Sequence, residues 1–374
     1  MKVVPVMAAL ANRAGISQSL VHTGQHYDAN MSHIFFQQLG LPEPDVNLEV
    51  GSGSHAAQTA QIMLRFEGVV LAQRPDLVLV YGDVNSTVAT ALVCAKLQIP
   101  VGHVEAGLRS FDRIMPEEIN RLLTDQMADL LFTPSADGNE NLQNEGIASE
   151  KIHLVGNVMI DTLVRLLPKA MQGWAAPAAP LAPHPLGRGT GKAGGLQECL
   201  NGRLENRPEQ RYALVTLHRP SNVDEPEMLT RIMATLIDIS CGLPVIFPVH
   251  PRTRHKLKTL SLGHFPSSLH LIEPIGYLDF LALQTRATLV ITDSGGIQEE
   301  TTFLGIPCLT VRENTERPIT VTMGTNILVG QDMDRLRSEA KQVLNGGAKR
   351  GQVPPLWDGQ AGERIAEVIC TWIS

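Results

Sequence analysis

Short apolar runs alternate with longer helical segments along the whole chain, and this alternation most limits the possible fold. Parallel strands that helices cover on both faces read as continuous apolar runs, whereas half-exposed strands alternate apolar and polar residues. The segments between the runs are long enough for crossover helices, for example 86–97, 117–127 and 228–239. We therefore expect an α/β protein with parallel sheets. The expected strands are 19–23, 77–81, 101–104, 130–132, 152–155, 212–217, 244–249, 269–272, 289–292 and 307–311.

A compositional break divides this pattern. Residues 174–195 read WAAPAAPLAPHPLGRGTGKAGG, rich in Pro and Gly and without a period, which predicts a linker or insertion over 171–209. We expect a Rossmann-like, doubly wound lobe on each side, at 1–170 and 210–357. A last helix over 358–374, capped by Asp358, is expected to pack back on the first lobe. Because ligands of open α/β sheets bind beyond the strand carboxyl ends, the site is expected in the interlobe cleft.

The segment LVITDSGGIQEE at 289–300 predicts a phosphate-binding turn. An apolar strand ends at Asp293, and Ser294, Gly295 and Gly296 lead into a helix. A helix N-terminus offers free N–H groups and a favourable dipole to an anion. Glu300, inside the first helical turns, is placed to reach a sugar hydroxyl. A Gly-Gly pair after a strand is also common in ordinary tight turns, so the turn alone is weak evidence.

Three carboxylates are candidates for proton transfer. Asp83 and Glu105 each end a predicted strand, and Glu117 begins a helix. Asp83 is also compatible with an N-cap cluster, and a helix-start role accounts for Glu118. A carboxylate at a buried strand end is costly without a task or a partner, which favours a function for Glu105. Placed together, Asp83, Glu105 and Glu117 could raise one another's pKa and exchange protons.

Basic residues follow several of the same strands. Arg109 is equally compatible with a loop-fastening ion pair and with a function. His218 ends a strand and could donate to a diphosphate. His250 is interpreted as structural or peripheral, whereas Arg312 and Arg317 are candidate partners of a phosphate or carboxylate.

Several classes of protein are not indicated. The His and Cys residues lack metal-ligand spacing, and neither G-x-G-x-x-G after a strand nor G-x-S-x-G is present. We expect no metal and no cofactor. A net charge of −7 without a basic block argues against nucleic acid and anionic membranes as partners. No apolar run reaches membrane-spanning length, and five scattered cysteines favour a reducing cytosol, so a cytoplasmic location is expected.

Nine motifs, in order, carry a family resemblance over nearly the whole chain outside 174–209. The chain resembles the non-hydrolysing UDP-N-acetylglucosamine 2-epimerases of bacteria and archaea. The motifs are HTGQHYD from His22, YGDVNST from Tyr81, GHVEAGLRS from Gly102, MPEEINR from Met115, GNVMIDTL from Gly156, TLHRPSN from Thr216, FPVHPR from Phe247, TDSGGIQEE from Thr292 and ENTERPIT from Glu313.

The resemblance implies a GT-B-type pair of lobes and reversible epimerisation at C2, which yields UDP-N-acetylmannosamine. The family's proposed route eliminates UDP to a 2-acetamidoglucal and adds it back. UDP-N-acetylglucosamine and UDP are then the expected ligands, and a homodimer is the expected assembly. The resemblance assigns acid and base roles to Asp83, Glu105 and Glu117, and the diphosphate to His218. The binding positions that it implies are Lys2, Arg121, Phe280, Ser294, Gly295, Gly296, Glu300, Arg312 and Arg317.

The chain departs from the family pattern at two places. It opens directly in a helix at 2–7, where the family has a strand and a Gly-Thr-Arg-Pro loop. We expect either a start upstream of Met1 or the loss of a central strand and one phosphate contact. Gln25, His26 and His250 fit the pattern of an additional activating site in some bacterial members. Residues 27–28 and 51–54 do not fit it, which argues against allosteric activation.

Three alternatives remain at this point. A hydrolysing epimerase would release free N-acetylmannosamine and UDP. A GT-B glycosyltransferase would need an acceptor. A non-catalytic nucleotide-sugar binder is compatible with the helical start.

Overall fold

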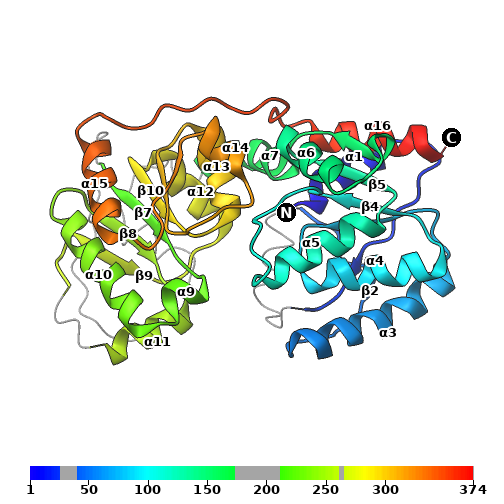
Figure 1. The fold of residues 1–374 in the computed structure, drawn as a ribbon, viewed down its shortest axis with the longest axis horizontal. Coiled ribbons are helices and arrows are strands. Elements are labelled where there is room, and N and C mark those ends of the chain that lie inside the picture. Colours follow the sequence, from blue (N-terminus) through cyan, green and yellow to red (C-terminus); the bar gives the residue numbers. More distant parts are fainter. Residues whose placement is uncertain (26–39, 173–210, 261–264, 374) are drawn as a thin grey trace.

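The computed structural model describes residues 1–25, 40–172, 211–260 and 265–373, and two α/β lobes lie side by side in it (Figure 1). The predicted linker or insertion falls almost wholly outside these residues, as does His26. Among the described residues, no helix has the length and apolar character that crossing a membrane requires.

The first lobe contains a four-stranded parallel sheet, ordered β3-β4-β5-β6, and a separate parallel pair, β1-β2. The chain enters this lobe in a helix, as predicted. The elements are α1 (Val3–Ala11), β1 (Val21–His22), β2 (Val46–Asn47), α3 (His55–Gln73), β3 (Val78–Tyr81), α4 (Asn85–Leu97), β4 (Val101–Val104), α5 (Pro116–Met127), β5 (Leu130–Thr133), α6 (Ala136–Asn144), a 3₁₀ turn (Ser149–Lys151), β6 (Ile152–Leu154) and α7 (Val158–Gln172).

The second lobe contains a six-stranded parallel sheet, ordered β12-β11-β10-β7-β8-β9. The order reverses beside β7, as it does in doubly wound folds. The elements are β7 (Ala213–Thr216), α9 (Pro220–Val223), α10 (Pro226–Ser240), β8 (Val245–Pro248), α11 (Pro251–Thr259), β9 (Leu269–Ile272), α12 (Tyr277–Arg286), β10 (Leu289–Thr292), α13 (Gly295–Leu304), β11 (Cys308–Thr310), α14 (Pro318–Thr322), β12 (Asn326–Leu328) and α15 (Met333–Leu344); α16 (Ala361–Ile373) follows.

The strands read as continuous apolar runs because helices cover both faces of their sheet, as expected. Val215 of β7 and Ile291 of β10 enter one core cluster with residues of α10 and α15. Their neighbours Leu214 and Val290 point to the opposite face and pack with Leu283 of α12. Since successive strand side chains alternate between faces, both positions must be apolar when helices cover both faces.

The last helix packs on the first lobe, and its N-terminal cap differs from the prediction. Ile365 and Ile369 of α16 join a cluster with Val6 of α1. Asp161 of α7, rather than Asp358, accepts the two N-terminal N–H groups of α16, from Ala361 and Gly362, at 3.1 and 2.7 Å. Asp358 instead accepts from the N–H of Gln360 and pairs with Arg364. A buried acceptor on a neighbouring helix cannot be identified from sequence spacing.

An apolar contact joins the two lobes. Val4 of α1 and Leu163 and Leu166 of α7 cluster with Leu281 and Ala282 of α12. Helix α7 therefore lies between the lobes, as Figure 1 shows, and also packs on α13. This contact fixes α13, with the predicted phosphate turn, against the first lobe.

Candidate active site

Glu105 lies directly after β4 and faces the second lobe. It is 6% exposed, and its backbone φ is +75°, in the left-handed region that non-glycine residues rarely adopt. Its carboxylate pairs with the ammonium of Lys2 and, across the lobes, with the Arg317 guanidinium at 2.6 Å. Strained backbone at a buried charged residue is typical of functional sites.

Two cations set the charge state of Glu105. Burial by itself raises the pKa of Glu105, but the charges of Lys2 and Arg317 outweigh it and hold the pKa below its usual value. Glu105 and Asp83 in turn raise the pKa of Lys2 against the opposing effect of burial. Glu105 is therefore ionised at neutral pH and able to accept a proton.

Arg317 connects the phosphate turn to Glu105. Its guanidinium lies 2.8 Å from Glu299 of α13, 2.6 Å from Glu316 and 2.6 Å from Glu105. A Cβ on Gly295 would clash with that guanidinium, so a larger residue where α13 begins would displace Arg317 from its carboxylates. The sequence did not indicate Glu299, because a second acidic residue beside Glu300 in a helix has no distinguishing pattern.

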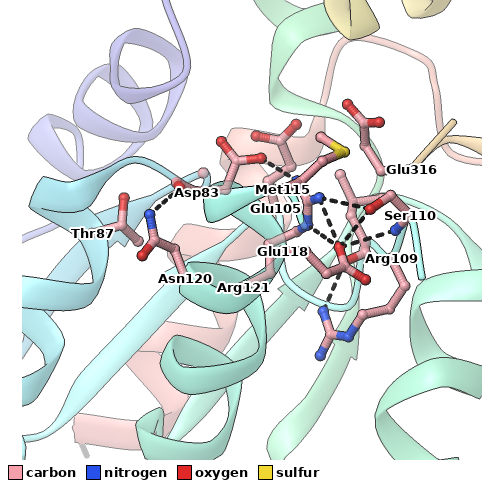
Figure 2. Close-up of polar contacts among 12 residues, drawn as sticks. Asp83, Thr87, Glu105, Arg109, Ser110, Met115, Glu118, Asn120, Arg121 and Glu316 are labelled. Carbon is pink, nitrogen blue, oxygen red and sulfur yellow. Dashed lines mark hydrogen bonds and ion pairs between the residues drawn. The ribbon is translucent and has the colours of Figure 1, made fainter. Parts of the chain in front are cut away.

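Asp83 contacts the first lobe's own arginine. Figure 2 shows Arg121 between Asp83 and Glu118, and Arg121 donates to both. The N-cap alternative for Asp83 is not observed, because α4 has no side-chain cap.

Glu118 has a larger role than a helix start. It is 1% exposed and accepts hydrogen bonds from the main chain of Ser110 and Phe111 at 3.0 and 2.8 Å. The second carboxylate of the PEE motif thus fastens the loop that follows Glu105, and it also fixes Arg121.

Glu117 is partly buried at the N-terminus of α5, near Arg219 of the second lobe. Burial lowers the pKa of the Arg219 guanidinium, and the charge of Glu117 is among those that oppose this lowering. Arg219 also approaches Met115 and lies 3.7 Å from Glu316. The lobes therefore bring Glu117 and the β7–α9 turn together at the same boundary.

Arg109 forms loop-fastening ion pairs, one of the two roles with which its sequence position is compatible. It pairs with Asp125 and Glu145, each at 2.7 Å. Asp125 is fully buried and also contacts His103 at 2.6 Å and the N–H of Gly107 at 3.1 Å. These contacts of Arg109, Asp125 and His103 stabilise the carboxyl end of β4, directly before Glu105.

His218 follows β7, and Asp293 orients it. The Asp293 carboxylate accepts from the main-chain N–H of His218 and Arg219 and from the side chain of Asn222. It also lies 3.0 Å from Nδ1 of His218, whose side chain is 58% exposed. Burial alone would raise the pKa of Asp293, but the hydrogen bond and charge of His218 lower it. The ring thus directs Nε2 away from Asp293.

The predicted phosphate turn forms as expected in its backbone. Helix α13 begins at Gly295, directly after Ser294, whose N–H is held by the Thr292 hydroxyl at 3.0 Å. A Cβ on Gly296 would lie 3.6 Å from Met159 of α7. Helix N-termini with this geometry favour anions.

Glu300 lies further along α13 and is 1% exposed. The Tyr277 hydroxyl donates to its Oε1 at 2.8 Å. Arg312, also buried, pairs with Glu316 at 2.6 Å. Phe280 packs beside Tyr212 and Leu283 in the second lobe's core.

The residues of the suggested activating site are only partly described. Gln25 accepts a hydrogen bond from Ser86 at 2.6 Å, beside the Asp83 turn. His250 is exposed at the start of α11. Within the part of the chain that the structure covers, no group of three or more His, Cys, Asp or Glu side chains is arranged to hold a metal.

A family model described as UDP-N-acetylglucosamine 2-epimerase matches residues 8–370. The UDP-N-acetylglucosamine 2-epimerase of Methanocaldococcus jannaschii is 42% identical over 98% of this chain and 95% of its own length. The UDP-2,3-diacetamido-2,3-dideoxy-D-glucuronate 2-epimerase of Pseudomonas aeruginosa is 41% identical over 97% of this chain and 94% of its own.

Solved structures agree over nearly the full length. The M. jannaschii enzyme, crystallised with UDP-GlcNAc and UDP, superposes with a TM-score of 0.84 at 41% identity over 99% of this chain and 96% of that one. The Neisseria meningitidis UDP-GlcNAc 2-epimerase, bound to UDP-GlcNAc, gives 0.83 at 28% identity over the same shares. The two Rossmann-like lobes thus have the GT-B-like arrangement expected from the motifs.

Proposed function

Since the chain belongs to the UDP-N-acetylglucosamine 2-epimerase family, we propose that it is an isomerase that interconverts UDP-N-acetylglucosamine and UDP-N-acetylmannosamine without hydrolysis. One observation carries the proposal: an ionised, buried Glu105 of one lobe is held against Arg317, beside the helix N-terminus of the other lobe. A proton acceptor and an anion-binding turn are what elimination of UDP requires.

The elimination follows from these groups. A carboxylate removes the C2 proton, the C–H electrons form the C1–C2 double bond of a 2-acetamidoglucal, and the C1–O bond breaks to release UDP. The N-terminus of α13 at Ser294, Gly295 and Gly296, together with Nε2 of His218 and a nearby arginine, stabilises the leaving oxyanion. Early loss of UDP matters because the C2 proton is weakly acidic.

Re-addition on the same glycal completes the inversion. A protonated group on the opposite face delivers a proton to C2 while UDP returns to C1. Asp83, Glu105 and Glu117 are the groups that we assign to these transfers. Asp83 and Glu105 are linked through the charges of Lys2 and Arg317, and Glu117 lies near Arg219 on the facing lobe.

The remaining contacts are assigned to the nucleotide and its sugar. We propose lobes at 1–170 with 358–374 and at 210–357, which hold the glycal and UDP together between them. Glu300 receives the ribose and Phe280 the uracil. The anionic and sugar groups of the substrate are bound by four basic residues, Lys2, Arg121, Arg312 and Arg317.

Proton NMR of the purified protein with UDP-N-acetylglucosamine in heavy water tests the proposal. We expect a mixture of the two UDP-sugars with deuterium at C2. Free N-acetylmannosamine as the main product would indicate a hydrolysing enzyme, and reaction only with an acceptor would indicate a glycosyltransferase. UDP binding in calorimetry without turnover would indicate a binding protein.

Glu105→Gln tests the assignment of the base. The change keeps the side-chain shape but removes the acceptor charge, so C2 exchange should fall by roughly 10²–10⁴-fold while UDP binding is retained. Glu67→Gln, at an exposed position of α3, is the control for loss of a charge. Near-normal exchange in Glu105→Gln would remove Glu105 from the mechanism.

The second relative favours one further substrate. The 41%-identical P. aeruginosa enzyme is named for UDP-2,3-diacetamido-2,3-dideoxy-D-glucuronate. The same C2 chemistry applies to both sugars, so both should be assayed in parallel. A kcat/KM higher for the glucuronate would change the assigned substrate but not the assigned reaction.

A further inference from the structure

Glu300 is a buried carboxylate with unequal oxygens. Oε1 accepts the Tyr277 hydroxyl at 2.8 Å, whereas Oε2 is buried and makes no hydrogen bond within the described residues. Burial raises the pKa of Glu300, and Tyr277 and Gln284, from the same helix, oppose that rise, although neither amide atom of Gln284 makes a hydrogen bond of normal geometry there. A buried carboxylate oxygen without a donor is costly, so Oε2 is the position where a ligand hydroxyl would be most favourable.

Tyr277 is suited to hold this arrangement. Burial and the neighbouring charge of Glu300 raise the pKa of the Tyr277 phenol, so it stays protonated and donates. Its position at the start of α12 is fixed by the apolar cluster that includes Leu278, Leu281 and Phe303. A donor fixed on one carboxylate oxygen prevents rotation of the carboxylate and leaves the other oxygen in one direction.

We propose that Tyr277 is a positioning residue that makes the nucleotide site specific for ribose: by occupying Oε1 of Glu300, it presents Oε2 to one ribose hydroxyl of UDP. The inference rests on the proposed function for the ligand, but not on catalysis. A nucleotide without that hydroxyl would leave Oε2 buried and unpartnered. Sites built to accept a hydroxyl reject the analogue that lacks it for this reason.

Calorimetric binding of UDP, 2′-deoxy-UDP and 3′-deoxy-UDP at pH 8 tests the proposal. The wild-type protein should bind UDP at least about tenfold more tightly than one of the two deoxy analogues. In Tyr277→Phe the affinity for UDP should fall about five- to tenfold, whereas the affinity for that analogue should change less than about twofold. With UDP-N-acetylglucosamine as substrate, KM should rise and kcat should change little.

Tyr212→Phe is the matched control. The Tyr212 hydroxyl is also buried in the second lobe and donates to a main-chain carbonyl of the same helix, that of Leu283. The substitution removes the same atom and should leave the preference for UDP over its deoxy analogue unchanged.

Each result decides the proposal. Wild-type discrimination in Tyr277→Phe would overturn it, as would an equal loss in Tyr212→Phe, which would assign the effect to helix packing. If Tyr277→Phe loses the wild-type discrimination and Tyr212→Phe keeps it, but the wild-type protein turns over no sugar, the proposed function would be contradicted and the role of Tyr277 supported. A wild-type protein that does not bind UDP would overturn both.

Discussion

Replacement of Glu300 by Gln should change how stability depends on pH. Burial raises the pKa of Glu300 from 4.5 to about 7. Between those values the folded protein keeps a proton that the unfolded chain has released. The contribution of Glu300 to the free energy of unfolding is therefore largest below pH 4.5, falls as pH rises to about 7, and is constant above it.

The size of the effect follows from the shift. A rise from 4.5 to about 7 corresponds to about 3 kcal/mol at full ionisation. The Glu300 side chain is 1% exposed, so solvent does little to screen it. Gln resembles the protonated acid and does not titrate, so the free energy of unfolding of Glu300→Gln does not include this decrease with rising pH.

The comparison uses urea unfolding, followed by circular dichroism without ligand, at pH 5, 6, 7 and 8. The difference between the two chains at each pH cancels the groups that they share. The free energy of unfolding of Glu300→Gln, relative to wild type, should increase by about 3 kcal/mol from pH 5 to pH 8. Glu67→Gln controls for the loss of a negative charge. A difference that stays constant with pH would refute the argument that burial holds the proton on Glu300.

Two further substitutions test the supports of the site. Asp125→Asn should lower the free energy of unfolding by about 3–5 kcal/mol, measured in urea, because it leaves Arg109 and His103 with one buried partner fewer; a cost below about 1 kcal/mol would contradict it. Asp293→Asn should lower kcat by about 10- to 100-fold with a smaller change in KM, because His218 loses the charge that orients its ring; steady-state kinetics with an unchanged kcat would show that His218 needs no such partner.

The fold could be predicted because strand burial leaves a strong pattern. Positions such as Leu214 and Val215 are both apolar because helices cover both sheet faces. The strands 46–47 and 326–328 were not predicted. They have only two and three residues, and Asn47 and Asn326 interrupt any apolar run.

The positions of the candidate site residues were predictable where a residue ends a strand, and less so elsewhere. Glu105 follows β4 directly and Asp83 follows β3 after one residue, so their position relative to the sheet is set by local sequence. The partners of those residues come from distant segments: Glu105 meets Arg317, 212 residues away, and Arg317 meets Glu299. The sequence offers several similar acidic residues as partners for each basic side chain. The packing of the two lobes decides which of them form the ion pairs.

The way the last helix completes the first lobe affects the order of folding during synthesis. Ile365 and Ile369 of α16 cover the same cluster as Val6 of α1, and the main-chain groups at Ala361 and Gly362 satisfy Asp161. The ribosome makes these residues after those of the second lobe. Domains generally fold from the N-terminus as they emerge, but here the second lobe can bury its sheet while the first still exposes apolar surface. The half of the protein that is synthesised first is therefore the half that finishes folding last, and it is the one for which chaperone contact on the nascent chain should last longest.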